Sequence, residues 1–231
     1  MTLHLLSAGA AQGLVRAIEP AFAAESGVAL SAHFGAVGAM RQRFDAGEPC
    51  DVIVLTAALI EALAARGLVR GDSRAKLGRV RTGIAVRTRD ASPDVSDADA
   101  LLAALLAADA IFVPDTERST AGQHVAKVLR QLGIDATVRD RLREFPNGAT
   151  AMRELAASTS DWLFGGTQHT EILYTPGVRL VAPLPQRFEL ATEYVAAVTS
   201  RAADAALAAR LVHALAGAES QALRTAGGFE A

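Results

Sequence analysis

Small residues recur at three points where an apolar run meets an amphipathic stretch, and this pattern is typical of backbone sites for anions. The three elbows are residues 7–10, 35–38 and 118–122. At the start of a helix, free N–H groups and the helix dipole attract negative charge, and small side chains let a ligand approach. Each elbow alone is also explained by the turn preference of Gly and Ser. Three of them together favour an anion site.

Polar side chains near these elbows could add hydrogen-bond donors. Arg118 could pair with a carboxylate through two parallel hydrogen bonds. The expected ligand-binding residues are Ser7, Ala8, Gly9, Ala10, Val37, Gly38, Thr56, Arg118, Ser119, Thr120, Ala121, Gln168 and Tyr194. Helix capping explains Ser7 and Thr56 equally well, a solvated surface explains Arg118, and a packed aromatic ring explains Tyr194.

His124 and His169 are candidates for a general base near neutral pH. Lone histidines are more often ordinary core or surface residues, so the sequence assigns no catalytic residue. No Cys/His/Asp cluster has the spacing of a metal site, and no dinucleotide or P-loop motif occurs. We therefore expect neither metal nor cofactor. Cys50 is the single cysteine, and we expect it to be a small buried hydrophobe.

The composition indicates a soluble globular protein, and the three elbows indicate a small anionic ligand as its partner. Of 231 residues, 51% are hydrophobic and 21% charged, and the net charge of −2 disfavours nucleic acid and anionic membranes. No apolar run is long enough for direct membrane insertion. No leader is visible, so the sequence as written predicts a cytoplasmic protein. Removal of a leader would make it periplasmic, and only an exported protein could serve an ABC transporter permease.

Apolar runs alternate with amphipathic stretches along the chain, which predicts the α/β class. Strands are expected at 3–6, 28–34, 51–56, 83–88, 110–115, 161–166, 178–185 and 193–199. Helices are expected at 11–26, 40–47, 57–67, 96–108, 119–133, 147–158, 167–173 and 204–217. Gly27, Gly67 and Gly133 should end helices, and Ser96 and Asn147 should cap them.

This alternation predicts two lobes, each a mainly parallel sheet flanked by helices. The first lobe is expected to contain residues 1–82 and 194–231, and the second residues 83–193. Two extended crossover segments would join the lobes, and the last helix would return to the first lobe. A small ligand is expected in the cleft between them, because such clefts are common ligand sites.

Several segments resemble the solute-binding proteins of molybdate ABC transporters. They are "LHLLSAGAAQGLVRAIEPAFAAESGVAL", "HFGAVGAMRQRFDAGEPCDVIVLT", "RSTAGQHVAKVLRQLGI" and "PGVRLVAPLP". The resemblance covers nearly the whole chain in order. It implies the two-lobed class II periplasmic-binding-protein fold, in which two α/β lobes close on an anion by a hinge motion.

The ligand positions depart from that family. A ligand-binding serine of the first elbow corresponds to Ala10, the serine-rich second elbow to residues 35–38, and a tyrosine to Gly166. A buried oxyanion needs dense hydrogen bonding, so the loss of three side-chain donors disfavours molybdate. "LLSAGA" and "DVIVLT" are more similar to a divergent branch that includes aconitate isomerase.

Two functions follow from these observations. The first is a solute-binding protein that closes on a small anion, an organic carboxylate rather than molybdate. The alternative is an isomerase of a di- or tricarboxylate such as aconitate on the same scaffold. Proton transfer next to a carboxylate would require a base and a site for the developing negative charge.

Overall fold

The computed structural model describes residues 2–231, and the contacts between residues divide the chain into two compact units. Unit 1 contains Met1–Val80 and Thr192–Ala231, and unit 2 contains Arg81–Ala191. The chain therefore leaves unit 1 once, completes unit 2 without interruption, and returns.

A mainly parallel sheet forms the centre of unit 1. Strand β1 (Thr2–Ala8) pairs in parallel with β2 (Ala29–Gly35) on one side and with β3 (Val52–Thr56) on the other. Strand β9 (Ala191–Val198) is antiparallel to β3, and β4 (Ala75–Arg87) is next in order. The first half of β4 belongs to unit 1 and the second half to unit 2.

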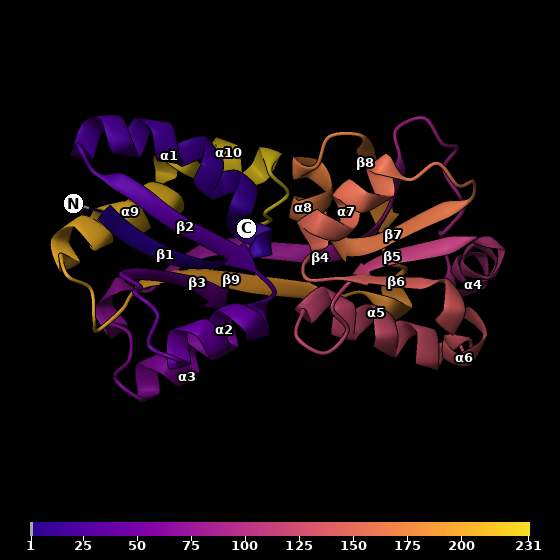
Figure 1. Ribbon diagram of the computed structural model, residues 1–231, viewed down its shortest axis with the longest axis horizontal. Helices are drawn as coiled ribbons and strands as arrows, with labels where there is room; N and C mark the ends of the chain where they lie inside the picture. Colours follow the sequence, from indigo (N-terminus) through magenta and orange to yellow (C-terminus); the bar gives the residue numbers. More distant parts are fainter. Residues whose placement is uncertain (1) are drawn as a thin grey trace. The chain divides into compact units, whose positions relative to one another are not determined.

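Helices cover both faces of this sheet (Figure 1). One face carries α1 (Gln12–Ser26), α9 (Ala205–Ala216) and α10 (Gln221–Ala226), and α1 contacts both of the others. The other face carries α2 (Val37–Asp45) and α3 (Ala57–Ala65). Unit 1 is thus a three-layer α/β/α arrangement.

The apolar spacing of α1 explains how it packs. Leu14, Ile18 and Phe22 recur at four-residue intervals, which places them on one face, and all three are buried in the core of unit 1. Gly27 has a φ of 68° and ends the helix, because glycine adopts the left-handed conformation without steric cost. Pro20 lies inside the helix and is exposed.

The sheet of unit 2 contains the second half of β4. This segment is antiparallel to both β7 (Leu163–Gln168) and β8 (Val178–Pro183). Strand β7 is parallel to β5 (Ala110–Pro114), which in turn is parallel to β6 (Leu142–Phe145). Alternate residues of β5 enter different cores, because successive side chains of a strand point to opposite faces: Ile111 joins one cluster and Phe112 the other.

Helices also cover both faces of the sheet in unit 2 (Figure 1). Helices α7 (Gly148–Ala157) and α8 (His169–Tyr174) lie on one face, with α5 (Thr120–Gln131) on the other. Helices α4 (Ala98–Ala107) and α6 (Asp135–Val138) complete the unit. Short 3₁₀ turns occur at Gly9–Ala11, Gly71–Ser73, Arg139–Arg141, Gln186–Phe188 and Ala218–Ser220. Within residues 2–231, no helix is both long and apolar enough to cross a bilayer.

The structure confirms one of the two predicted helix N-caps and contradicts the other. Asn147 caps α7, since its Oδ1 accepts the N–H of Thr150 at 2.9 Å. Asp97 caps α4 by accepting the N–H groups of Asp99 and Ala100, so the prediction for Ser96 is wrong. Adjacent Ser and Asp residues are both good N-caps, and the sequence does not decide which one the backbone places at the helix start.

Candidate functional site

Three parallel strands of unit 1 end side by side, and each leads directly into a helix. Ala8 is paired with Gly35 at the ends of β1 and β2, and Ser7 is level with Val54 near the end of β3. Ligands of open α/β sheets bind at this carboxyl edge. The edge brings together the predicted residues Ser7, Ala8, Gly9, Ala10, Val37, Gly38 and Thr56.

The helices at this edge begin without a side-chain cap. Ala8 precedes the 3₁₀ turn that opens α1, Ala36 precedes α2, and Thr56 precedes α3; within the described residues, none of these three side chains accepts a first-turn N–H. Helix α9 of the same unit is different, because Asp204 Oδ1 accepts the N–H of Leu207 at 2.9 Å. Uncapped N–H groups need another acceptor, which water or an anion can supply, and a ligand role for this edge stays a prediction.

The polar side chains predicted to bind a ligand at this edge differ in burial and in the contacts that they already make. Ser7 is fully buried and its hydroxyl donates to the carbonyl of Ala8 at 3.0 Å. Thr56 is half-buried and is paired with Tyr194 across β3 and β9. Tyr194 is buried and packs edge-on against Phe229, with ring centroids 6.5 Å apart. Tyr194 thus packs in the core of unit 1, and Thr56 lies half-buried beside the α3 N-terminus. A ligand role for either residue stays a prediction.

Unit 2 has a similar edge, where the parallel strands β5 and β7 end. The predicted residues Arg118, Ser119, Thr120 and Ala121 follow β5, and Gln168 is the last residue of β7. Ser119 caps α5, since its hydroxyl accepts the N–H of Gly122 at 3.4 Å. Arg118 is 53% exposed and its Nε donates to Asp115 Oδ2 at 2.7 Å. Capping and a surface ion pair thus account for two of these residues, and a ligand role for them stays a prediction.

Two buried hydroxyl groups near Gln168 were not expected from the sequence. Thr82 is level with Gln168 across β4 and β7, and Thr170 follows two residues later in α8. Among residues 2–231, the Oγ1 atoms of Thr82 and Thr170 have no hydrogen-bond partner. A buried polar atom without a partner costs free energy, so these two hydroxyl groups are an energetic cost of the fold at this edge. Threonine is ordinary in strands and turns, so no signal in the sequence marks these two.

Both candidate histidines are already engaged in packing or hydrogen bonding. His124 Nε2 lies 2.7 Å from the carbonyl oxygen of Phe188. His169 is buried against Gly83, where an added Cβ would lie only 2.5 Å from Nε2 of the imidazole. Neither ring is presented as an exposed base, and a catalytic role for either stays a prediction.

Glu171 is a buried carboxylate that the sequence analysis missed. Its Oε2 accepts the Thr167 hydroxyl at 2.6 Å, and backbone N–H groups of Gln168, Gly148 and Ala149 also donate to it. Gly148 and Ala149 open α7, so the start of this helix lies against a carboxyl group of its own chain. Burial raises the pKa of Glu171, although the four hydrogen bonds act in the opposite direction.

Cys50 is buried as expected. Its thiol contacts the carbonyl oxygen of Val52 at 3.1 Å, and burial raises its pKa to about 12. A thiol with this pKa is not a nucleophile near neutral pH. In the part of the chain that the structure describes, no three His, Cys, Asp or Glu side chains are grouped to hold a metal ion.

The fold and the sequence together define the class of protein. The chain belongs to the bacterial extracellular solute-binding proteins, whose family model matches residues 3–230. The aconitate isomerase of a Pseudomonas species is 29% identical over 224 residues, which cover 93% of this chain and 82% of that protein.

Solved structures confirm the periplasmic-binding-protein-like fold. The periplasmic molybdate-binding protein of Azotobacter vinelandii has a TM-score of 0.80 at 19% identity, and the match covers 99% of both chains. The sulfate-binding protein SubI of Mycobacterium tuberculosis has a TM-score of 0.75 at 20% identity, covering 99% of this chain and 86% of that one. The resemblance inferred from the sequence is thereby confirmed.

Proposed function

We propose that this chain binds a small organic carboxylate, and that the uncapped helix starts of unit 1 donate N–H groups to it. One observation carries the proposal. Helices α1, α2 and α3, which follow the carboxyl ends of parallel strands, start without a side-chain cap in the described residues, as does the short α10, whereas α9 of the same unit is capped by Asp204. An ionised carboxylate is an acceptor only and matches a surface made of donors.

The scarcity of hydroxyl groups favours a carboxylate over a tetrahedral oxyanion. At the unit 1 edge, Ser7 already donates to a backbone carbonyl, and positions Ala10 and Ala36 have no polar side chain. An oxyanion buried among so few donors would keep unsatisfied oxygens, which is costly. The aconitate isomerase relative supports a di- or tricarboxylate as the ligand class.

A thermal-shift panel tests the ligand class. It compares cis- and trans-aconitate, citrate and simple dicarboxylates with molybdate, tungstate and sulfate. A ligand at about 100 times its dissociation constant adds about 2.7 kcal/mol to the free energy of unfolding. We expect stabilisation by at least one carboxylate and none by the metal oxyanions. Stabilisation by molybdate or tungstate alone would overturn the proposal.

Two variants of one residue test the proposed binding edge. Thr56→Asp and Thr56→Asn place nearly equal N-caps on α3, but only aspartate adds a negative charge. A charge about 5 Å from a bound carboxylate costs about 3 kcal/mol at an effective dielectric of ~20, which is roughly a hundredfold in affinity. We expect Thr56→Asp to abolish the thermal shift and Thr56→Asn to keep most of it. Equal affinities of both variants would place the ligand elsewhere.

Isomerase activity is the second candidate function, and the 29% identity with an aconitate isomerase favours it. The same N–H groups that hold a carboxylate would stabilise negative charge developing beside it. Proton NMR of trans-aconitate incubated with the protein in deuterium oxide would show cis-aconitate and exchange of the methylene protons. Binding without product or exchange assigns the chain to solute binding only.

A further inference from the structure

Unit 2 contains a pocket at the opposite edge of its sheet from Gln168. The pocket has a volume of about 460 Å³ and lies where β7 starts and β4 ends. Val86, Leu163, Phe164 and Ala104 supply apolar walls, and charged residues of two loops complete the lining. Ligand pockets commonly have this size and this mixture of apolar walls and a few polar groups.

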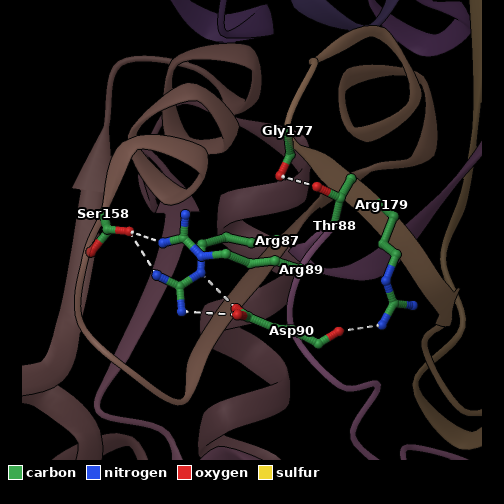
Figure 2. A network of polar contacts seen from close by, with 7 residues as sticks. All are labelled: Arg87, Thr88, Arg89, Asp90, Ser158, Gly177 and Arg179. Carbon is green, nitrogen blue, oxygen red and sulfur yellow. Dashed lines mark hydrogen bonds and ion pairs between the residues drawn. The ribbon is translucent and has the colours of Figure 1, made fainter.

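A hydrogen-bond network fixes the two loops that form the pocket (Figure 2). The buried guanidinium of Arg87 binds both carboxylate oxygens of Asp90, at 2.6 and 3.0 Å, and the carbonyl of Ser158 at 2.6 Å. Arg89 donates to the same carbonyl at 3.0 Å, and Arg179 holds the backbone oxygen of Asp90 at 2.7 Å. The loop after β4 is therefore tied to the loop after α7, so the pocket is largely formed before anything binds.

Two of the charged side chains that line this pocket, one basic and one acidic, form no ion pair within the described residues. The charges of Arg87 and Asp90 neutralise each other through their bidentate pair. Arg89 and Asp161 also line the pocket and are exposed, and within residues 2–231 neither forms an ion pair. In the described residues the pocket thus offers one cation and one anion without an ion-pair partner, although Arg89 also donates to the Ser158 carbonyl, and this is complementary to a zwitterion.

Trp162 marks the opening of the pocket. Its side chain is 74% exposed, although tryptophan is the largest apolar residue, and its backbone has a φ of 48°. The left-handed conformation is unfavourable for a bulky residue and is often retained where function requires it. An indole ring beside Asp161 is also well suited to an ammonium group through a cation–π contact.

We propose that this pocket binds a free α-amino acid with an apolar side chain. The ammonium group meets Asp161 and the face of Trp162, the carboxylate meets Arg89, and the apolar side chain lies against Val86 and Phe164. The residues that line this pocket do not include those at the carboxyl ends of β5 and β7, so its ligand does not compete for Gln168.

Trp162 is the single tryptophan of the chain, so its fluorescence reports directly on this pocket. The probe is L-leucine, which does not absorb at the excitation wavelength of tryptophan. N-acetyl-L-leucine lacks the ammonium group, and L-leucinamide lacks the carboxylate. We expect a saturable change with L-leucine and at least about tenfold weaker binding of both derivatives, since each loses a charge-assisted contact. The absence of a saturable change with L-leucine overturns the proposal, as does equal affinity for either derivative.

Charge-neutral variants of similar shape assign the two contacts. Asp161→Asn should abolish the preference for L-leucine over N-acetyl-L-leucine, and Arg89→Gln should abolish the preference over L-leucinamide. The exposed residues Asp72 and Arg153 lie outside the pocket lining, so Asp72→Asn and Arg153→Gln are matched controls that should keep both preferences. Retention of either preference in the corresponding pocket variant would refute the assigned contact.

Discussion

Truncation of Glu171 should destabilise the protein more than any ordinary surface substitution. Glu171→Ala removes the acceptor for the Thr167 hydroxyl and for the N–H groups of Gly148, Ala149 and Gln168, and it leaves a cavity. Each orphaned buried donor costs roughly 1–3 kcal/mol, and the cavity left by the side chain adds to this cost. We expect a loss of about 4 kcal/mol in the free energy of unfolding. Urea titration followed by circular dichroism measures it.

Glu171→Gln is the matched control for this prediction. The amide keeps the size of the side chain and one carbonyl acceptor for the α7 N–H groups, so at pH 7 it should cost less than half as much as alanine. If Glu171→Ala lies within about 1 kcal/mol of the unchanged protein, the carboxylate does not hold α7 and α8 together, and the reasoning is wrong.

The pH dependence provides a second test of Glu171. Its folded pKa is raised by burial above the ordinary value of 4.5. The folded state therefore binds a proton at Glu171 more tightly than the unfolded state does. The stability gained from this proton binding is complete below pH 4.5 and is lost as pH rises through the folded pKa. The amide side chain of the control variant does not titrate in this range. Relative to Glu171→Gln, the unchanged protein should thus lose stability as pH increases from 4.5, and a gain in that window would contradict the pKa direction.

Three further predictions concern other positions. Gly148→Ala should cost about 1–3 kcal/mol in urea titration, because its Cβ would lie 1.9 Å from Glu171 Oε2; an unchanged midpoint would show that this contact relaxes freely. Pro20→Ala should raise the free energy of unfolding by about 1–2 kcal/mol, because an exposed proline inside α1 removes a helical hydrogen bond; a lower melting temperature would refute this. Cys50 should resist iodoacetamide at about pH 8 in the native state and react after denaturation, since its pKa is about 12; fast native labelling, measured by mass spectrometry, would exclude a buried thiol.

Apolar periodicity was sufficient to predict most of the elements. The spacing of Leu14, Ile18 and Phe22 predicts α1, and the continuous apolar run at residues 52–55 predicts the buried strand β3. Strand β6 was missed because its sequence is short and polar, with only partial burial at its ends. It is an edge strand with one neighbour, so no apolar face of its own reveals it.

The candidate site was predictable only where it depends on the backbone. Small residues before helices are visible in the sequence, and the uncapped starts of α1 and α2 follow from them. The uncapped start of α3 does not, because Thr56 is itself a good N-cap residue. The hydrogen bonds of individual side chains depend on residues that are far away in the sequence. His124 contacts the carbonyl of Phe188, 64 positions later, and Arg87 reaches Ser158 across 71 positions. No local pattern encodes such pairs, so the pocket at Trp162 could not be anticipated.

The return of β9 to unit 1 constrains the order in which the chain can fold while it is being synthesised. Val52 is paired with Val198, so the whole of unit 2 must leave the ribosome before β3 gains its second neighbour. Unit 2 is continuous in sequence and can complete its own cores first. Until then the apolar strand β3 has an open edge, and such edges pair with other chains. We therefore expect nascent chains that stop before Thr192 to depend on chaperones that cover this strand, whereas the full-length chain protects it with its own C-terminal segment.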